Sequence, residues 1–519
     1  MARISPFQRI VASALFVFPW LVSPLAAQEA PAAQPAPEQA AVETPPPPSP
    51  APPVPPPAPP PAPVTLSPQV RAFLAVEPGS VALTHVRIID GTGAPASEDQ
   101  TILIADGRIT AIGPAASTPA PQGARVIDLA GHSVLPGWVG MHEHLFYTAT
   151  IEAGGEPAFL QMSHSFPLLY LAAGATTIRT AGAVQGQTDI NVAAGIAAGR
   201  RAGPEVHATA PYLGREGHLI ELSEERGAER MRAAVDYWAG AGATSIKAYM
   251  QATREELRAI VTTAHARNLR VTGHICATSF AEAAAIGIDN LEHGFLVASD
   301  FVADRQPDVC PANPFAGLSR ITTPQAPEAQ ALFATLREHR VAITSTLAVL
   351  EQFTATSPPP RPETLLAMAP HSRASCIEQR RQTAAVPGDP FRPLYEREMA
   401  FELAFVRGGG TLLAGSDPTG NGCVIAGDGL QRQIELLVTA GFTPLEAIRI
   451  GTLNGATFLG IADRTGSVAV GKEADLIVVR GDPATRIEEI RNVRFVFSNG
   501  AGYDPTRLAN AARGWVGIR

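Results

Sequence analysis

Six residues of this 519-residue chain have the types and the order of a metal-binding set. Each lies at or near the end of a short apolar segment that favours a β-strand; the six are His142, His144, Lys247, His274, His293 and Asp417. Imidazole nitrogens and carboxylate oxygens bind divalent metals, and two such ions can share one bridging water. An ammonium group has no lone pair and cannot bind a metal, so the lysine fits the set if it is converted with CO2 to a carbamate.

The order of these residues matters more than any one of them. Side chains alternate along a strand, so His142 and His144 share one face and Glu143 points away from it. A single His-x-His is weak evidence, Lys247 alone would be a solvated or salt-bridged lysine, and Asp417 alone would serve as a turn cap. Their succession on consecutive strand segments favours a joint site.

The segments that carry these residues alternate with helical patterns. The strand candidates are VLPGWVGMH, TTIRTAG, EVHATAP, SIKAYM, RVTGHI, NLEHGF, VAITSTL and LLAGSD. Eight alternations predict an α/β chain folded as a (β/α)8 TIM-type barrel, whose C-terminal strand ends carry the chemistry. Short strand patterns from residue 81 and again after residue 466 predict a small β-sandwich domain built from both flanks of the barrel.

The predicted boundaries follow from shifts in composition. We expect a signal peptide at 1–27, a Pro/Ala-rich disordered linker at 28–64, the first part of the β domain at 65–136, the barrel at 137–462 with an insertion at about 350–389, and the second part with a C-terminal tail at 463–519. Cleavage would leave no stable membrane span and a periplasmic or secreted protein. The alternative is an uncleaved N-terminal anchor.

Composition restricts the partners of the chain. The formal net charge is -8 and the pI is near 5.9, which argues against nucleic acid, because phosphate binding needs a basic face. A small-molecule substrate is the expected partner. Residues 466–479 are apolar enough for subunit contacts in a homo-oligomer, and equally typical of a core.

The four cysteines permit disulfides if the chain is exported. Cys310 and Cys376 both lie in irregular or inserted segments, so we predict that this pair forms a bridge. Cys276 is then interpreted as a small buried side chain. The alternative is four unpaired thiols.

Longer motifs extend the pattern. They are VLPGWVGMHEHL, GATTIRTAG, ATSIKAY, VTGHICA, NLEHGF, LLAGSDP, TPLEAIRIGTLNGATFLG and GSVAVGKEADLIVV. From about residue 81 to the C-terminus the chain resembles the amidohydrolase superfamily, with imidazolonepropionase-like and Xaa-Pro dipeptidase-like members as the nearest types. The motifs are very specific for the superfamily and much less specific for a substrate.

The resemblance implies a ligand set and a mechanism. His142 and His144 would bind the more buried metal with Asp417, while His274 and His293 would bind the second. A carbamate on Lys247 would bridge the two ions across about 3.5–4 Å. Zinc is the expected metal, with manganese, cobalt and nickel as alternatives. Bridging hydroxide would attack a carbonyl, and Asp417 would carry its proton to the leaving nitrogen.

Substrate residues are predicted less sharply. In the resembling family a histidine at the position of His218 touches the substrate, whereas a plain loop histidine is the alternative. Tyr249 shares a strand face with Lys247 and either donates a hydrogen bond to the substrate or forms part of the barrel wall. Many relatives have Arg-Asp at Arg179-Thr180 and Arg at Glu205, which leaves the substrate details open.

The function expected from the resemblance is hydrolysis of dipeptides or N-acyl amino acids, including Xaa-Pro bonds and ochratoxin-type amides. A second enzymatic interpretation is hydrolysis of cyclic amides, lactones or phosphotriesters at the same site. A third is an inactive envelope-binding module. Inactive relatives usually lose metal ligands, and this chain retains all six, which favours an enzyme.

Overall fold

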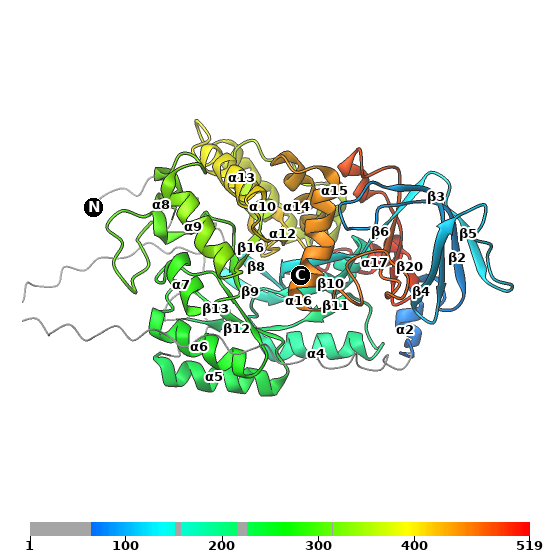
Figure 1. The fold of residues 1–519 in the computed structure, drawn as a ribbon, viewed down its shortest axis with the longest axis horizontal. Coiled ribbons are helices and arrows are strands. Elements are labelled where there is room, and N and C mark those ends of the chain that lie inside the picture. The colour runs from blue at the N-terminus through cyan, green and yellow to red at the C-terminus, as the bar shows by residue number, and fades with distance from the viewer. Residues whose placement is uncertain (1–63, 151–156, 215–225, 314) are drawn as a thin grey trace, which may run out of the picture.

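The computed structural model describes residues 64–150, 157–214, 226–313 and 315–519 (Figure 1). The predicted signal peptide, nearly all of the predicted linker and His218 lie outside these ranges. Within them, no helix is long and apolar enough to cross a membrane.

Parallel strands in chain order form the scaffold of the molecule. They make two hydrogen-bonded sheets: the first joins β7 (Trp138–Glu143), β10 (Ala175–Thr180) and β11 (Glu205–His207), and the second joins β12 (Thr209–Leu213), β13 (Ser245–Ala248), β14 (Arg270–Gly273), β15 (Asn290–Glu292), β16 (Ala342–Ser345) and β17 (Leu412–Ala414). Every residue of β7, β10, β12, β13 and β16 is buried, as expected for parallel strands covered on both faces.

The arrangement is TIM-barrel-like, although the ladder between the first and last strands is missing. The Asp417 amide donates to the His142 carbonyl at 2.9 Å, beyond the end of β17. Across the described chain no strand pairing joins β17 to β7, so the closed barrel predicted from the sequence is not observed. The first predicted strand is also divided: β6 (His132–Pro136) belongs to another sheet, and β7 begins after Gly137, where a Cβ would collide with Thr176.

Helices follow the parallel strands and surround them (Figure 1). Their first turns are fixed by short polar motifs: Thr253 with Glu256 and Ser279 with Glu282 form capping boxes at the starts of α6 and α7, just after β13 and β14. The helices are α3 (Ser165–Ala172), α4 (Gly186–Ala197), α5 (Ala228–Ala241), α6 (Arg254–Ala266), α7 (Phe280–Ile286), α8 (Ala316–Arg320), α9 (Pro327–Glu338), α13 (Arg392–Arg407), α14 (Asp428–Thr439), α15 (Pro444–Arg449) and α16 (Gly455–Leu459).

The segment expected to be an insertion at about 350–389 is helical. It follows α10 (Leu347–Glu351) and contains α11 (Pro362–Ala367) and α12 (Pro370–Ala384). The C-terminal residues return to it: Met368 pairs with Val516, and the Ile518 amide donates to the Ser372 hydroxyl at 3.0 Å. The insertion is therefore packed against the tail that follows α17 (Pro505–Ala511).

The flanks of the barrel-like unit meet in one nine-stranded sheet. It contains β1 (Leu74–Val76), β2 (Val81–Ile88), β3 (Ser97–Ala105), β4 (Arg108–Pro114), β5 (Arg125–Asp128), β6, β18 (Leu476–Arg480), β19 (Val493–Ser498) and β20 (Ala501–Tyr503). Both flanks contribute, as predicted, but the strands join in a single hydrogen-bonded sheet, so the sandwich is not confirmed. Within 466–479, β18 lies between β19 and β6, and its residues 476–479 are core.

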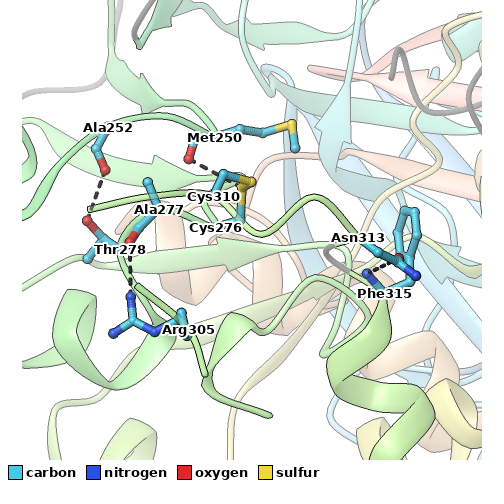
Figure 2. The surroundings of a disulfide bond; sticks show 9 residues. All are labelled: Met250, Ala252, Cys276, Ala277, Thr278, Arg305, Cys310, Asn313 and Phe315. Carbon is cyan, nitrogen blue, oxygen red and sulfur yellow. Dashed lines mark hydrogen bonds between the residues drawn. A yellow bond between two sulfur atoms is a disulfide. The ribbon is translucent and has the colours of Figure 1, made fainter. Parts of the chain in front are cut away.

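The predicted Cys310–Cys376 bridge is wrong. The structure joins Cys276 to Cys310, with Cα atoms 4.9 Å apart, and Cys376 to Cys423, with Cα atoms 5.1 Å apart. Cys276 follows β14 by three residues, and Figure 2 shows its sulfur bonded to that of Cys310. Cys376 lies on α12, which packs on the short helix 421–423 after β17. The sequence around Cys310 and Cys376 did not show that their segments pack near the ends of different strands, β14 for Cys310 and β17 for Cys376.

Removing the first disulfide should lower the stability of the fold. We expect the double substitution Cys276→Ser and Cys310→Ser to reduce the free energy of unfolding by about 2–4 kcal/mol, because the bridge closes a loop in the unfolded chain. Denaturant unfolding of the oxidised proteins measures this. Peptide mapping without reductant should recover both observed linkages, and a Cys310–Cys376 peptide would contradict the structure.

Candidate metal centre

The structure gathers the six predicted residues at the carboxyl ends of the parallel strands. His142 lies in β7 and Lys247 in β13, whereas His274 and His293 directly follow β14 and β15. Candidate ligand atoms of His142, His293 and Asp417 all lie within 4.8 Å of one another. The His293 ring centroid is 4.5 Å from that of His142 and 4.4 Å from that of His274. His142, His274, His293 and Asp417 therefore form one connected group.

Asp417 is the anionic centre of this group. Its Oδ1 lies 3.1 Å from His144 Nε2 and 3.5 Å from His142 Nε2. Burial alone would raise the pKa of this carboxyl, but the neighbouring histidines, His142 first, hold it well below its usual value. Glu143 points away from the histidines, as predicted, and accepts the Ser416 amide at 3.0 Å. That bond fixes the residue immediately before Asp417.

Two candidate ligands have an unusual backbone conformation. The φ angles are 64° at His293 and 51° at Asp417, both in the left-handed region that β-carbon sterics disfavour. Such conformations persist only where the surroundings impose them, and they concentrate at functional sites. The carbonyl of Asp417 accepts the Thr419 amide at 2.8 Å, which stabilises this turn.

Three histidines are oriented through their Nδ1 atoms. His142 Nδ1 lies 2.8 Å from Glu292 Oε2, His144 Nδ1 lies 3.0 Å from the Gly182 carbonyl, and His293 Nδ1 lies 2.9 Å from Thr346 Oγ1. Each arrangement leaves Nε2 available for another partner. Metal-binding histidines are typically held in this way by an outer partner on the second nitrogen. The donor set therefore fits a divalent metal.

Glu292, which sequence reasoning missed, connects this set to the interior. It is fully buried, and its carboxylate binds His142, accepts from Arg179 Nη2 at 2.7 Å and accepts from the Thr272 hydroxyl. Burial would raise its pKa, but Arg179 and then His142 and Lys247 hold it well below the usual value. The signal in the sequence was a glutamate inside NLEHGF, an otherwise buried strand.

Lys247 is buried beside this carboxylate without being bonded to it. It is 1% exposed, and its Nζ lies 3.9 Å from Glu292 Oε1. Within the described ranges this Nζ has no hydrogen-bond partner. Burial lowers the pKa of Lys247 to about 8, so the amine loses its proton more readily than an exposed lysine does. A buried amine with a lowered pKa and no hydrogen-bond partner in the described structure, among candidate metal ligands, fits the predicted conversion to a carbamate.

The histidines mostly favour the neutral form that metal binding requires. Burial, followed by Lys247 and His142, lowers the pKa of His274 to about 3. Burial also lowers the pKa of His144 and of His293. For His142 the direction is reversed: burial disfavours the charged form, but Glu292 and Asp417 outweigh it and raise the pKa.

An apolar wall borders one side of the group. Tyr249 contacts the His274 ring with centroids 5.3 Å apart, and Phe146 contacts the His144 ring at 4.6 Å. Burial raises the pKa of Tyr249, so its hydroxyl stays protonated at neutral pH. The remaining members of the wall are Val184, Tyr212, Met250, Phe159 and the Cys276–Cys310 pair. Tyr249 is thus part of a wall and also adjacent to a candidate ligand.

Thr180 and Glu205, the two residues that depart from the family pattern, both make hydrogen bonds or ion pairs to other parts of the fold. The Thr180 hydroxyl accepts the Thr209 amide at 2.9 Å, which connects β10 with β12. Glu205 accepts from Arg464 at 3.0 Å, and this arginine also binds Glu473 at 2.8 Å. These residues fasten strands to neighbouring segments, outside the group of six.

Comparisons with known proteins show which proteins this chain is similar to. Residues 398–501 match the model of the amidohydrolase family. An imidazolonepropionase from Arthrobacter sp. (strain FB24) is 28% identical over 138 residues, 27% of this chain and 32% of that protein. The alignment thus spans about a third of this relative. The resemblance inferred from the motifs is confirmed, and the family and its relatives are hydrolases of amide and peptide C–N bonds.

Solved structures support the fold over most of the chain. A candidate prolidase from Bifidobacterium longum has a TM-score of 0.60 at 25% identity. The match covers 84% of this chain and 100% of that one. The A. niger ochratoxinase has a TM-score of 0.58 at 18% identity, covering 83% of this chain and 96% of its own. At such identities the second comparison establishes the fold alone.

Replacing Glu292 should destabilise the protein strongly. Glu292→Gln leaves the buried Arg179 guanidinium without its anionic partner, and we expect a loss of about 3–5 kcal/mol in the free energy of unfolding. Glu446→Gln is the matched control, because its ion pair with Arg407 is exposed and should contribute at most about 1 kcal/mol. Equal losses in the two variants, measured by urea unfolding, would contradict the role assigned to Glu292.

The stability of the metal-free protein should depend on pH through the histidines. A histidine whose folded pKa is depressed binds fewer protons folded than unfolded, so stability falls as pH decreases below its unfolded pKa. His274, at about 3 in the fold, should contribute up to about 1.4 kcal/mol per pH unit below about 6.5. We expect His274→Asn to remove part of the slope between pH 6.5 and 5, and an unchanged slope would exclude this contribution.

Proposed function

We propose that this chain is a metal-dependent hydrolase of amide bonds that holds two divalent ions at the group of six residues. The observation that carries the proposal is the convergence of His142, His293 and Asp417, with ligand atoms within 4.8 Å. The orientation of the histidines by Nδ1 partners supports it. So does the buried Lys247 amine, which has no hydrogen-bond partner among the described residues and as a carbamate would supply anionic oxygen ligands for these ions.

Zinc is the metal we propose, because four imidazoles, a carboxylate and a carbamate suit it. When bound, such ions supply Lewis acidity toward a carbonyl and lower the pKa of water. A protonated imidazole nitrogen cannot bind a metal. The lowered pKa values of His144, His274 and His293 keep these side chains uncharged at neutral pH. Metal identity and stoichiometry are part of the proposal.

Asp417 is proposed to move the proton in the reaction. Its carboxylate stays ionised beside three histidines and is partly accessible, whereas His142 and His144 are buried. A carboxylate in this position can accept a proton from water and deliver it to the leaving nitrogen. The Glu143 bond to the Ser416 amide keeps Asp417 aligned for both transfers.

The proposed substrates are dipeptides and N-acyl amino acids, including Xaa-Pro and ochratoxin-type amides. The named relatives support this range, and the apolar wall around Tyr249 and Phe146 suits a hydrophobic acyl or side-chain group. His218 is proposed to contact the substrate from the segment between β12 and α5. Cyclic amides, lactones and phosphotriesters form the alternative panel, because the same ligand set suits their electrophilic centres.

We also propose that the protein is exported and works in the periplasm or outside the cell. Two disulfides support this, since such bonds persist mainly in oxidising compartments. The basic and apolar N-terminal residues and the following Pro-rich stretch supply the signal and the tether.

Substituting the proposed proton carrier tests the mechanism. Asp417→Asn should retain some metal but lose about 10²–10⁴-fold in kcat on an N-acyl-phenylalanine or Xaa-Pro substrate, because the amide cannot accept the proton. Metal content is measured on the same sample.

The control is Asp463→Asn, a surface change outside the group, which should leave kcat unchanged. Turnover close to that of the unmodified protein in metal-loaded Asp417→Asn would remove Asp417 from the mechanism. A purified protein that binds no metal after incubation with zinc and bicarbonate would overturn the proposed function itself.

A further inference from the structure

We propose that Glu398 and Glu402, on consecutive turns of α13, are positioning residues that hold His293 in its ligand geometry. The inference rests on the proposed metal centre and goes beyond it. Both side chains are fully buried, at 0% exposure. Neither belongs to the group of six, and together they reach both segments that fix His293.

The first connection is to the backbone after His293. Glu398 Oε1 accepts the Phe295 amide at 2.8 Å. Gly294 has a φ of 64°, equal to that of His293, and a Cβ there would overlap the Glu398 carboxyl and lie 2.9 Å from Glu402 Oε1. The two carboxyl groups therefore pack against the α-carbon of Gly294, the residue after His293. They support the left-handed backbone conformation at this point.

The second connection is to the side chain that orients the imidazole. The Ser345 hydroxyl donates to Glu402 Oε2 at 2.7 Å, and Gln433 Nε2 donates to the same hydroxyl at 2.7 Å. Ser345 immediately precedes Thr346, whose Oγ1 lies 2.9 Å from His293 Nδ1. Glu402 thus fixes the end of β16 that presents the partner of the ring.

The two carboxyl groups lie against the same glycine, Gly294. In the described structure Glu398 Oε2 and Glu402 Oε1 have no hydrogen-bond donor. Burial raises the pKa of both groups, and for Glu398 the neighbouring Glu402 raises it further. Burial therefore favours the protonated form of each carboxyl, and both groups lie within 3.0 Å of the position that a Cβ would take at Gly294, so the backbone connection and the ring connection adjoin there.

The experiment compares Glu398→Ala with Glu398→Gln. Alanine removes the acceptor of the Phe295 amide, so the second zinc equivalent should bind at least about tenfold more weakly. Glutamine keeps an acceptor oxygen and adds a donor toward Glu402, so it should restore affinity to within about threefold. Isothermal titration of the metal-free full chain with zinc and bicarbonate provides the affinities.

A second readout needs no metal. In metal-free protein labelled at histidine carbons, the His293 Cε1–Hε1 cross-peak, assigned with His293→Asn, should shift in Glu398→Ala and stay in place in Glu398→Gln. Asp300→Asn is the matched control. Asp300 is a partly buried acid that also accepts backbone amides, from Phe280 at 2.8 Å and from Ala281 at 2.9 Å, and neither donor belongs to the group of six. It should alter stability but not the cross-peak or zinc affinity.

Each outcome is decisive. Unchanged zinc affinity and an unchanged cross-peak in folded Glu398→Ala would overturn the positioning role. If the unmodified protein binds no zinc, the proposed function fails, and the cross-peak still decides whether these carboxyl groups position His293. If Glu398→Ala does not fold, Ser345→Ala cuts the ring connection with little change in volume; an unshifted cross-peak in that variant would equally overturn the inference.

Discussion

A buried carboxylate determines much of the interior of this molecule. Glu292 has no access to water, yet it stays ionised because Arg179, His142 and Lys247 surround it. Removing Arg179 would leave the Glu292 charge without its main counterion in a region of low dielectric. The orientation of His142, the placement of Lys247 and the burial of Arg179 are consequences of that one charge.

Around this centre, the histidines and Asp417 are held in place by local arrangements that are unfavourable in free energy by themselves. Left-handed backbone at His293 and Asp417 is unfavourable in isolation, and fully buried acids on α13 are unfavourable as well. The contacts that compensate come from strands and helices far apart in the sequence. Rigid elements thereby position side chains that short local segments could not hold.

Much of the scaffold and of the site could be predicted from residue types and order. Strand ends were visible because apolar runs stop at His142, His274 and His293, and parallel strands place their carboxyl ends at one edge. Glu292 was missed because its partners come from three other strands. The disulfides were mispaired because spacing does not reveal which strand end a loop covers. The sandwich was expected from strand patterns, which do not specify how strands join.

The order of pairing in the nine-stranded sheet has a consequence for synthesis. β6 pairs with β18, so a strand that ends at residue 136 can form this pairing only after the strand that begins at residue 476 has been made. The emerging chain therefore carries an open sheet edge until residues 476–480 have been made. Contacts so distant in sequence slow folding and leave apolar strands exposed to other chains meanwhile. Until β18 is available, the edge of β6 must be kept from pairing with strands of other chains.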